Sequence, residues 1–351
     1  MNDLCNFLLL GCVASMIACS NDSKTFVGPD SGSLGGAGTD TGGATASGGS
    51  TESRGAGGTT GSIGGAAEAG VVGNGGTLSA GGAQVEAGTD ASPGSSYDGG
   101  VHLEHVFVIA MENHDETQII GDLTDAPYIN GTLVKEYAST SNFVDTLPIA
   151  VPSEPHYLLM EAGTNAFSDV TFTSDANPSA ANSTSSTEHL VRQMKDAQPA
   201  VTWLSYQEGL DDTTGACPIA SSAFYAPKHD PFVFFQDVSG SPPNGSNSYC
   251  AEHHKPYSSF EADLAAGTLP PYVYITPNLC DDMHGAADCP GGTATGSDIH
   301  DGDTWLSREL PRIMTYADAH DSVIYLVWDE GSSNQTIPFL ALGPHVKTGS
   351  N

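Results

Sequence analysis

Four side chains that can bind a metal follow directly after apolar segments of the chain. Glu112 and Asn113 come after one such segment, and Asp329 and Glu330 come after another. All four offer hard oxygen ligands, a set that suits Ca, Mg or Mn, with Zn as a further candidate. A single divalent cation held there could lower the pKa of a hydroxyl nucleophile and neutralise a phosphoryl oxygen.

A serine and three histidines could complete such a site. Ser153 lies between two prolines in the segment 151–157, and we expect these prolines to stiffen a loop and fix its direction. His156, His229 and His284 stand in polar segments beside prolines or acids. Imidazoles at the edge of a site can bind phosphate oxygens or protonate a leaving group. Taken alone, each of these residues fits an ordinary turn or structural role equally well.

Short apolar runs alternate with helix-like segments through the second part of the chain. The runs are rich in β-forming residues and too short for helices, and they span 105–110, 201–206, 272–276, 323–328 and 339–342. The helix-like segments span 128–137, 187–197, 260–266 and 304–317. Continuous apolar runs suit strands buried on both faces. The alternation therefore predicts an α/β sandwich around a mostly parallel sheet.

Three of the predicted strands end directly in polar residues. These endings are 112–113 after the first strand, 277–278 after the third and 329–330 after the fourth. In open parallel sheets, ligands gather at the carboxyl ends of the strands. A single such ending usually only starts a turn, but three together favour a site at one edge of the sheet.

The cysteines indicate an oxidising compartment. Outside the first 19 residues the chain has four, Cys217, Cys250, Cys280 and Cys289. A bridge between Cys280 and Cys289 would close a short loop and leave Cys217 to pair with Cys250. A zinc site is the alternative, although no pair has the CxxC spacing.

Composition separates the chain into three parts. Residues 1–19 form a short apolar stretch that resembles a lipoprotein signal peptide with Cys19 as the lipidated residue; ordinary secretion is the alternative. Residues 20–101 are dominated by Gly, Ser, Thr and Ala, which predicts a disordered tether. Residues 102–351 are long enough for one sizeable core.

The charge of the chain argues against nucleic-acid binding. The 10 Lys and Arg face 42 Asp and Glu, giving a formal net charge of −32. Nucleic-acid binding requires a basic surface that displaces counterions, and none is present here. An anionic substrate would need a strong local cation, which a bound metal could supply.

An ordered set of motifs resembles a known family. The motifs are MEN at 111–113, SEPHYL at 153–158, KHDPF at 228–232, ITPNLCDDMHG at 275–285, GDTWL at 302–306 and WDEG at 328–331. Together they resemble the phosphoesterase family of bacterial acid phosphatases and phospholipase C-type enzymes within the alkaline phosphatase superfamily. The resemblance covers residues 104–349 and implies a three-layer α/β/α sandwich. The family continues past this point, so the domain 102–351 is expected to be truncated at its C-terminus.

The resemblance also implies a role for each matching residue. Glu112, Asn113, Asp329 and Glu330 would bind the metal, and Ser153 would be both a ligand and the nucleophile of a phosphoserine intermediate. His229, Asn278 and His284 would line the phosphate pocket, supported by Asp282, and a histidine would protonate the leaving alcohol. His156 stands where the family usually has Asn, so it is expected to make a different pocket contact.

Three functions compete at this stage. The first is an exported acid phosphatase that acts on small phosphate monoesters with a mildly acidic optimum. The second keeps the chemistry but acts on phosphodiesters or phospholipids. The third is a surface-tethered protein that binds a ligand without turnover, because a tether says where a domain sits and nothing about its activity.

Overall fold

The computed structural model describes residues 102–210, 216–289 and 296–349. The predicted signal peptide, the predicted lipidation site Cys19 and the predicted tether 20–101 lie outside these residues. Among the helices that are described, none combines the length and apolar character needed to cross a membrane.

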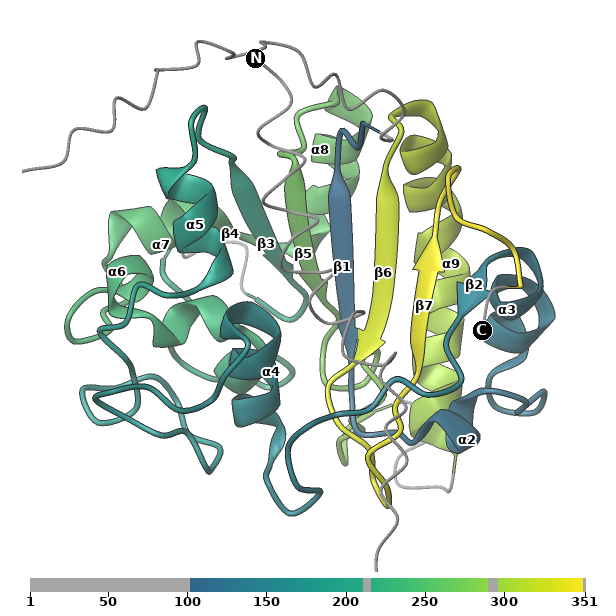
Figure 1. Ribbon diagram of the computed structural model, residues 1–351, viewed down its shortest axis with the longest axis horizontal. Coiled ribbons are helices and arrows are strands. Elements are labelled where there is room, and N and C mark those ends of the chain that lie inside the picture. Colours follow the sequence, from purple (N-terminus) through teal and green to yellow (C-terminus); the bar gives the residue numbers. More distant parts are fainter. Residues whose placement is uncertain (1–101, 211–215, 290–295, 350–351) are drawn as a thin grey trace, which may run out of the picture. The chain divides into compact units, whose positions relative to one another are not determined.

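A seven-stranded sheet forms the centre of the domain (Figure 1). Its strands are β1 (Val106–Met111), β2 (Ala138–Ser139), β3 (Trp203–Gln207), β4 (His254–Pro256), β5 (Tyr272–Thr276), β6 (Val323–Trp328) and β7 (Phe339–Leu342). They lie in the order β2-β7-β6-β1-β5-β3-β4. The five strands from β6 to β4 run parallel, and β7 pairs antiparallel with both β6 and β2. The prediction of a mostly parallel sheet is therefore confirmed.

Short helices and one long helix connect the strands. The α-helices are α2 (Glu116–Ile119), α3 (Val134–Glu136), α4 (Ser153–Ala162), α5 (Leu190–Asp196), α6 (Gln236–Ser239), α7 (Ser248–His253), α8 (Phe260–Ala266) and α9 (Ser297–Ala319). A π-helix, η1 (Ile129–Leu133), precedes α3. Three 3₁₀ turns complete the set: η2 (Pro227–His229), η3 (Pro231–Phe234) and η4 (Tyr257–Ser259).

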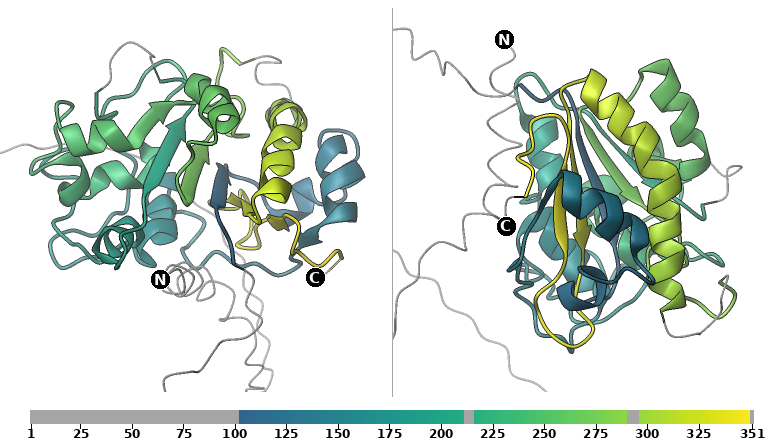
Figure 2. Two further views of the ribbon diagram at one scale, coloured as in Figure 1. Left: turned by 90° about the horizontal axis from the view of Figure 1, so that it is seen from above. Right: turned by 90° about the vertical axis from the view of Figure 1, so that its right-hand side faces the viewer.

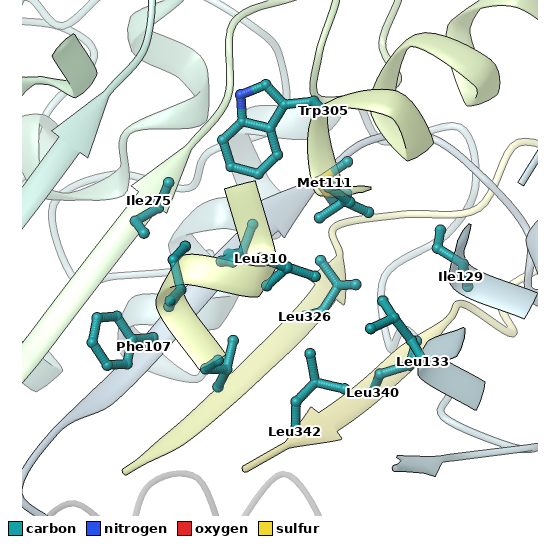
Figure 3. Close-up of a cluster of buried hydrophobic side chains, with 14 of the residues drawn as sticks. Phe107, Met111, Ile129, Leu133, Ile275, Trp305, Leu310, Leu326, Leu340 and Leu342 are labelled. Atoms are coloured by element: carbon teal, nitrogen blue, oxygen red, sulfur yellow. The ribbon is translucent and has the colours of Figure 1, made fainter. Parts of the chain in front are cut away.

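Two hydrophobic cores lie on opposite faces of the sheet, as the pleat of β1 requires. Phe107 on one face belongs to the core that also contains Trp305 and Leu310 of α9 (Figure 3). Ala110 on the other face belongs to the core that contains Tyr157 of α4 and Leu190 of α5. Helices therefore cover both faces, and α9 lies along one side of the sheet (Figure 2). The domain has the predicted three-layer α/β/α architecture.

The segment around Ser153 differs from the prediction. It is not a stiffened loop, because Ser153 is the first residue of α4, with the extended Pro152 as its N-cap. Pro155 falls in the first turn of the helix, where its missing N–H removes no helical hydrogen bond. Prolines in this position start a helix, and the expectation of a loop is wrong.

Helix α9 begins seven residues earlier than the predicted segment 304–317. Its first two turns are mostly polar, so they carry little apolar signal. Within this part, Gly302 lies against the side chain of Met283 in the segment after β5, so closely that a β-carbon would overlap it. At this position the backbone of α9 packs directly against the segment that follows β5, because Gly302 has no side chain.

Both predicted disulfides are present. Cys217 pairs with Cys250 across a Cα–Cα distance of 5.1 Å, and Cys280 pairs with Cys289 across 5.4 Å. Because all four thiols are used in bridges, the zinc alternative for these cysteines is wrong.

Candidate active site

The polar ends of three strands meet at one edge of the sheet. β6, β1 and β5 are neighbours and run parallel, so the segments that follow them emerge side by side. The backbone N–H of Glu112 donates to the carbonyl of Asp282 at 2.8 Å, and that of Asn113 donates to Asp329 Oδ1 at 3.0 Å. These contacts join the three segments into one site.

Ser153 lies between two of the predicted metal-binding carboxylates. Its Oγ is 3.1 Å from Glu112 Oε2 and 3.1 Å from Glu330 Oε1. Helix α4 carries the serine to this place from the opposite side of the sheet from α9, and the side chain is buried. The hydroxyl and the carboxylates therefore belong to the same centre.

The acidic groups of this centre are buried without enough partners. Burial raises the pKa of Glu112 to about 7 and that of Glu330 to about 7. The pKa of Asp329 is raised well above its usual value, first by burial and then by repulsion from Glu112. Glu112 Oε1, Asn113 Oδ1 and Asp329 Oδ2 are buried and accept no hydrogen bond from the described residues. Such a surplus of oxygen ligands fits a divalent cation.

His229 joins the cluster from η2. Its Nε2 is 3.1 Å from Glu112 Oε1 and its Nδ1 is 3.2 Å from Asp282 Oδ2. The ring stacks on Tyr157 at a centroid distance of 5.2 Å. Burial, followed by the nearby charge of Lys228, lowers the pKa of His229 well below its usual value. The ring therefore lies between two acidic groups, in surroundings that favour its neutral form.

His284 forms the edge of the same site. Its backbone N–H donates to Asp282 Oδ1 at 2.8 Å, and its ring centroid lies 5.5 Å from that of His229. Glu112, His229 and His284 each place one ligand atom within 4.8 Å of the others. The structure thus brings two of the predicted phosphate-pocket histidines next to the carboxylates.

Lys228 is a site residue that sequence reasoning missed. Its Nζ lies 3.3 Å from His284 Nε2 and 2.8 Å from Asp175 Oδ2, and its side chain is mostly buried. The pKa of Lys228 is raised, because the charges of Glu112 and Asp175 outweigh the effect of burial. The sequence offered one signal that could have identified Lys228: it directly precedes His229, in a chain that has only 10 Lys and Arg residues.

His156 lies behind the site rather than at its edge. The side chain is buried, with Nδ1 3.2 Å from Asp145 Oδ1 and Nε2 3.5 Å from Glu330 Oε2. Although burial opposes it, these two carboxylates raise the pKa of His156. The contacts favour a role in orienting Glu330, and Asp145 was not foreseen because it lies in an irregular segment that carries no motif.

Asn278 uses its side chain within its own turn. Its Oδ1 accepts from the backbone of Cys280 at 2.9 Å, and its Nδ2 donates to Asp281 Oδ2 at 2.9 Å. These bonds shape the segment that carries Asp282 and His284. Binding of phosphate by Asn278 stays a prediction.

Two residues of the site have left-handed backbone conformations. Asn113 has φ 51° and Met283, between Asp282 and His284, has φ 77°. Asn adopts this region more readily than most residues, whereas Met does so rarely. The segments after β1 and β5 are thus held in sharp turns that aim their polar side chains, a pattern typical of functional sites.

Comparison with known proteins agrees with this geometry. The sequence pattern of the Phosphoesterase family matches residues 130–349, more than half of the chain. A curated relative, phosphatidylinositol-3-phosphatase of Mycobacterium tuberculosis (strain ATCC 25618 / H37Rv), is 29% identical over 248 residues, which are 70% of each chain.

Two solved structures show a more distant likeness. An alkaline phosphatase superfamily protein from Vibrio parahaemolyticus has a TM-score of 0.45 at 12% identity; the match covers 70% of this chain and 61% of that one. The lipoteichoic acid synthase LtaP from Listeria monocytogenes has a TM-score of 0.40 at 12% identity, with 70% of this chain and 67% of that one covered. The family match, and not these likenesses, decides the assignment. The chain belongs to the phosphoesterase family.

Proposed function

We propose that this phosphoesterase is an exported, metal-dependent phosphatase that hydrolyses small phosphate monoesters, with Ser153 as its nucleophile. The observation that supports it most is the position of the Ser153 hydroxyl between Glu112 and Glu330, next to buried oxygens that lack partners. A non-catalytic binding protein has no need to bury a hydroxyl among repelling carboxylates.

Five residues are suited to hold the metal. They are the predicted set Glu112, Asn113, Ser153, Asp329 and Glu330, all gathered at the ends of β1 and β6 and the start of α4. When bound, the cation supplies positive charge that stabilises the serine alkoxide and the phosphoryl oxygens. The oxygen-rich set suits Ca, Mg or Mn, and Zn also fits it.

The remaining residues have separate tasks in this mechanism. Ser153 Oγ attacks phosphorus while the bond to the leaving alcohol breaks, which gives a phosphoserine that water then hydrolyses. An oxygen of Glu112 or Glu330 that does not bind the metal would accept the hydroxyl proton, because both side chains lie 3.1 Å from the hydroxyl. Lys228 provides a fixed positive charge beside His284 that can bind the transferred phosphate.

We assign protonation of the leaving alcohol to His284, which lies at the edge of the site beside His229. Burial, with help from the charge of Lys228, lowers its pKa below the usual value. The protonated imidazole is therefore present only under acidic conditions, and we expect activity to increase as the pH falls from neutral into the mildly acidic range.

Turnover of p-nitrophenyl phosphate tests the proposal. We expect activity in the purified protein, loss of it with EDTA, and recovery on addition of a divalent metal. Ser153→Ala should be inactive, and the control Ser307→Ala, on the exposed side of α9, should match the wild type. Undiminished activity in Ser153→Ala would end the assignment of the nucleophile.

A phosphorylated lipid is the second candidate substrate. The relative from Mycobacterium tuberculosis is named for action on a phosphoinositide, and it covers most of this domain. Comparing p-nitrophenyl phosphate, phosphatidylinositol 3-phosphate and bis-p-nitrophenyl phosphate separates a small-molecule phosphatase, a lipid phosphatase and a diesterase.

Export with lipid attachment at Cys19 is the cellular part of the proposal. The residues 16–19 support it, and the two disulfides suit an oxidising compartment. We expect the protein to fractionate with membranes and Cys19→Ser to be released from them. Equal partitioning of the two forms would contradict lipid attachment.

A further inference from the structure

A cavity of about 950 Å³ adjoins the candidate active site. Its wall is formed by residues between 114 and 125 after β1, by 284–287 after β5 and by 296–299 at the start of α9. This volume is near the upper end of the range for small-molecule sites. It is far more than a phosphate group requires.

The cavity shares a wall with the catalytic residues. His284 lines it and also lies beside Lys228 and His229 in the phosphate site. His114, another wall residue, directly follows the metal-binding candidate Asn113. A phosphate ester bound at Ser153 can therefore extend its alcohol portion past His284 into this space.

The charge on the wall is negative. Asp122, Asp125 and Asp298 line the cavity, and the wall residues include neither Lys nor Arg. Among the described residues none of the three forms an ion pair with Lys or Arg; Asp298 has only His114, at 3.6 Å. The cavity thus repels anions and attracts cations.

A buried histidine fixes one of these acids in the wall. The His114 side chain is 7% exposed, and its Nε2 is 3.2 Å from the carbonyl of Met283 and 3.6 Å from Asp298 Oδ2. The side chain of Gln118, another wall residue, is a further hydrogen-bonding neighbour of the ring. His114 therefore lies between Met283 and Asp298 and keeps this carboxylate at the cavity wall.

We propose that this cavity receives the leaving alcohol of the substrate and selects alcohols that are cationic, or neutral and rich in hydroxyls, over anionic ones. The inference rests on the proposed function and narrows its substrate class. Hydroxyl or ammonium groups of the alcohol would contact Asp298 and the neighbouring acids. An alcohol that bears its own carboxylate or phosphate would be repelled by the same groups.

Three phosphate monoesters of similar size test the selection. They are phosphoethanolamine, glycerol 1-phosphate and 3-phosphoglycerate, whose alcohols are cationic, neutral and anionic. We expect kcat/KM to fall in this order, with about a tenfold difference between the first and the last at low salt. This difference should shrink at high salt, because screening weakens the interaction.

Two variants assign the effect to the cavity wall. Asp298→Asn should reduce the ratio of kcat/KM for phosphoethanolamine over 3-phosphoglycerate at least threefold. Thr117→Lys, an exposed position of the wall on α2, should reduce or invert the same ratio without altering a buried group. The control Asp318→Asn makes the same change of charge at an exposed position near the other end of α9 and should keep the wild-type ratio.

The outcomes separate this inference from the proposed function. If none of the monoesters, including p-nitrophenyl phosphate, is hydrolysed, the proposed function is wrong. If all are hydrolysed and the ratio is unchanged in both Asp298→Asn and Thr117→Lys, the phosphatase assignment holds and the role of the cavity is overturned. If Asp298→Asn does not fold, Thr117→Lys alone decides.

Discussion

Two of the buried groups of charged residues in the described part of the domain differ in one respect. The strand-end cluster, Glu112, Asp282, Asp329 and Glu330, holds acids that repel one another and leave oxygens unpaired. The second, which we call the α4–α5 cluster, consists of Glu161, His189 and Asp237. Here His189 contacts Glu161 Oε1 and Asp237 Oδ1, each at 3.0 Å, and Glu161 also accepts from the backbone of Val191 at 2.8 Å.

The difference separates a site from a structural support. Both clusters are buried, and in each of them a carboxylate contacts a histidine: Glu161 contacts His189, and Glu112 contacts His229. Burial alone therefore does not distinguish the two clusters. In the α4–α5 cluster the charges and hydrogen bonds are balanced within the protein. In the strand-end cluster they are not, and the missing partner must come from outside. Helix α4 reaches both, with Ser153 at its start and Glu161 near its end.

The same substitution in each cluster gives the largest contrast. Glu112→Gln should lower kcat/KM for p-nitrophenyl phosphate at least about 10³-fold, because it removes a ligand and a proton acceptor beside Ser153. Glu161→Gln should keep activity within about threefold under conditions where it is folded. Equal losses in the two variants would remove the distinction between the clusters.

Breaking the α4–α5 cluster should mainly affect stability. His189→Gln leaves Glu161 buried without its charged partner, so we expect the free energy of unfolding to fall by about 3 kcal/mol. Urea denaturation measures it. The double variant Glu161→Gln/His189→Gln should recover part of the loss, and a single-variant loss below about 1 kcal/mol would contradict the structural role.

The strand-end cluster should respond in the opposite way when it holds no metal. In EDTA at pH 8, Asp329→Asn should raise the free energy of unfolding by about 1 to 2 kcal/mol. The pKa of Asp329 is higher in the folded protein than in the unfolded chain, and Asn removes the cost of that difference at a pH where the unfolded Asp is ionised. Metal at about 100 times its dissociation constant should stabilise the wild type by about 2.7 kcal/mol and the variant far less. A destabilised Asp329→Asn protein in EDTA would show that the cluster is balanced after all.

The smallest effect is a dependence of stability on pH. Asp237 and Glu161 outweigh burial and raise the pKa of His189 to about 9, above its value in the unfolded chain. The stabilisation by protonated His189 is therefore complete below pH of about 6.5 and is lost as the pH rises through about 9. Burial also raises the pKa of Glu161, a shift that likewise costs stability as the pH rises. The stability difference between wild type and His189→Gln should therefore shrink across this window. A constant difference would mean that His189 is neutral.

Local sequence pattern was sufficient for five of the seven strands of the sheet. The predicted strands 272–276, 323–328 and 339–342 match β5, β6 and β7. Short continuous runs of apolar β-forming residues fit a buried strand better than any other secondary structure. β4 and α7 were not predicted, since they are short and their apolar content is low. Their positions depend on the Cys217–Cys250 bridge and on packing around Trp203.

The site was predictable where its residues follow strands. Glu112 and Asp329 could be placed together because parallel neighbours end at the same edge. Lys228 with Asp175, and His156 with Asp145, could not be paired, since each contact joins segments that are far apart in sequence or lie in irregular loops. The cavity beside His284 was also beyond sequence reasoning, because three separate segments form it.

The contact between Gly302 and Met283 makes one helix position a determinant of the active site although it carries no reactive group. A methyl group added there would push the turn that carries Asp282 and His284 away from α9. In a random mutagenesis screen that retains only well-expressed proteins, codon 302 should therefore appear among the inactive clones. Such clones would be mistaken for defects of the core unless the displaced turn is considered.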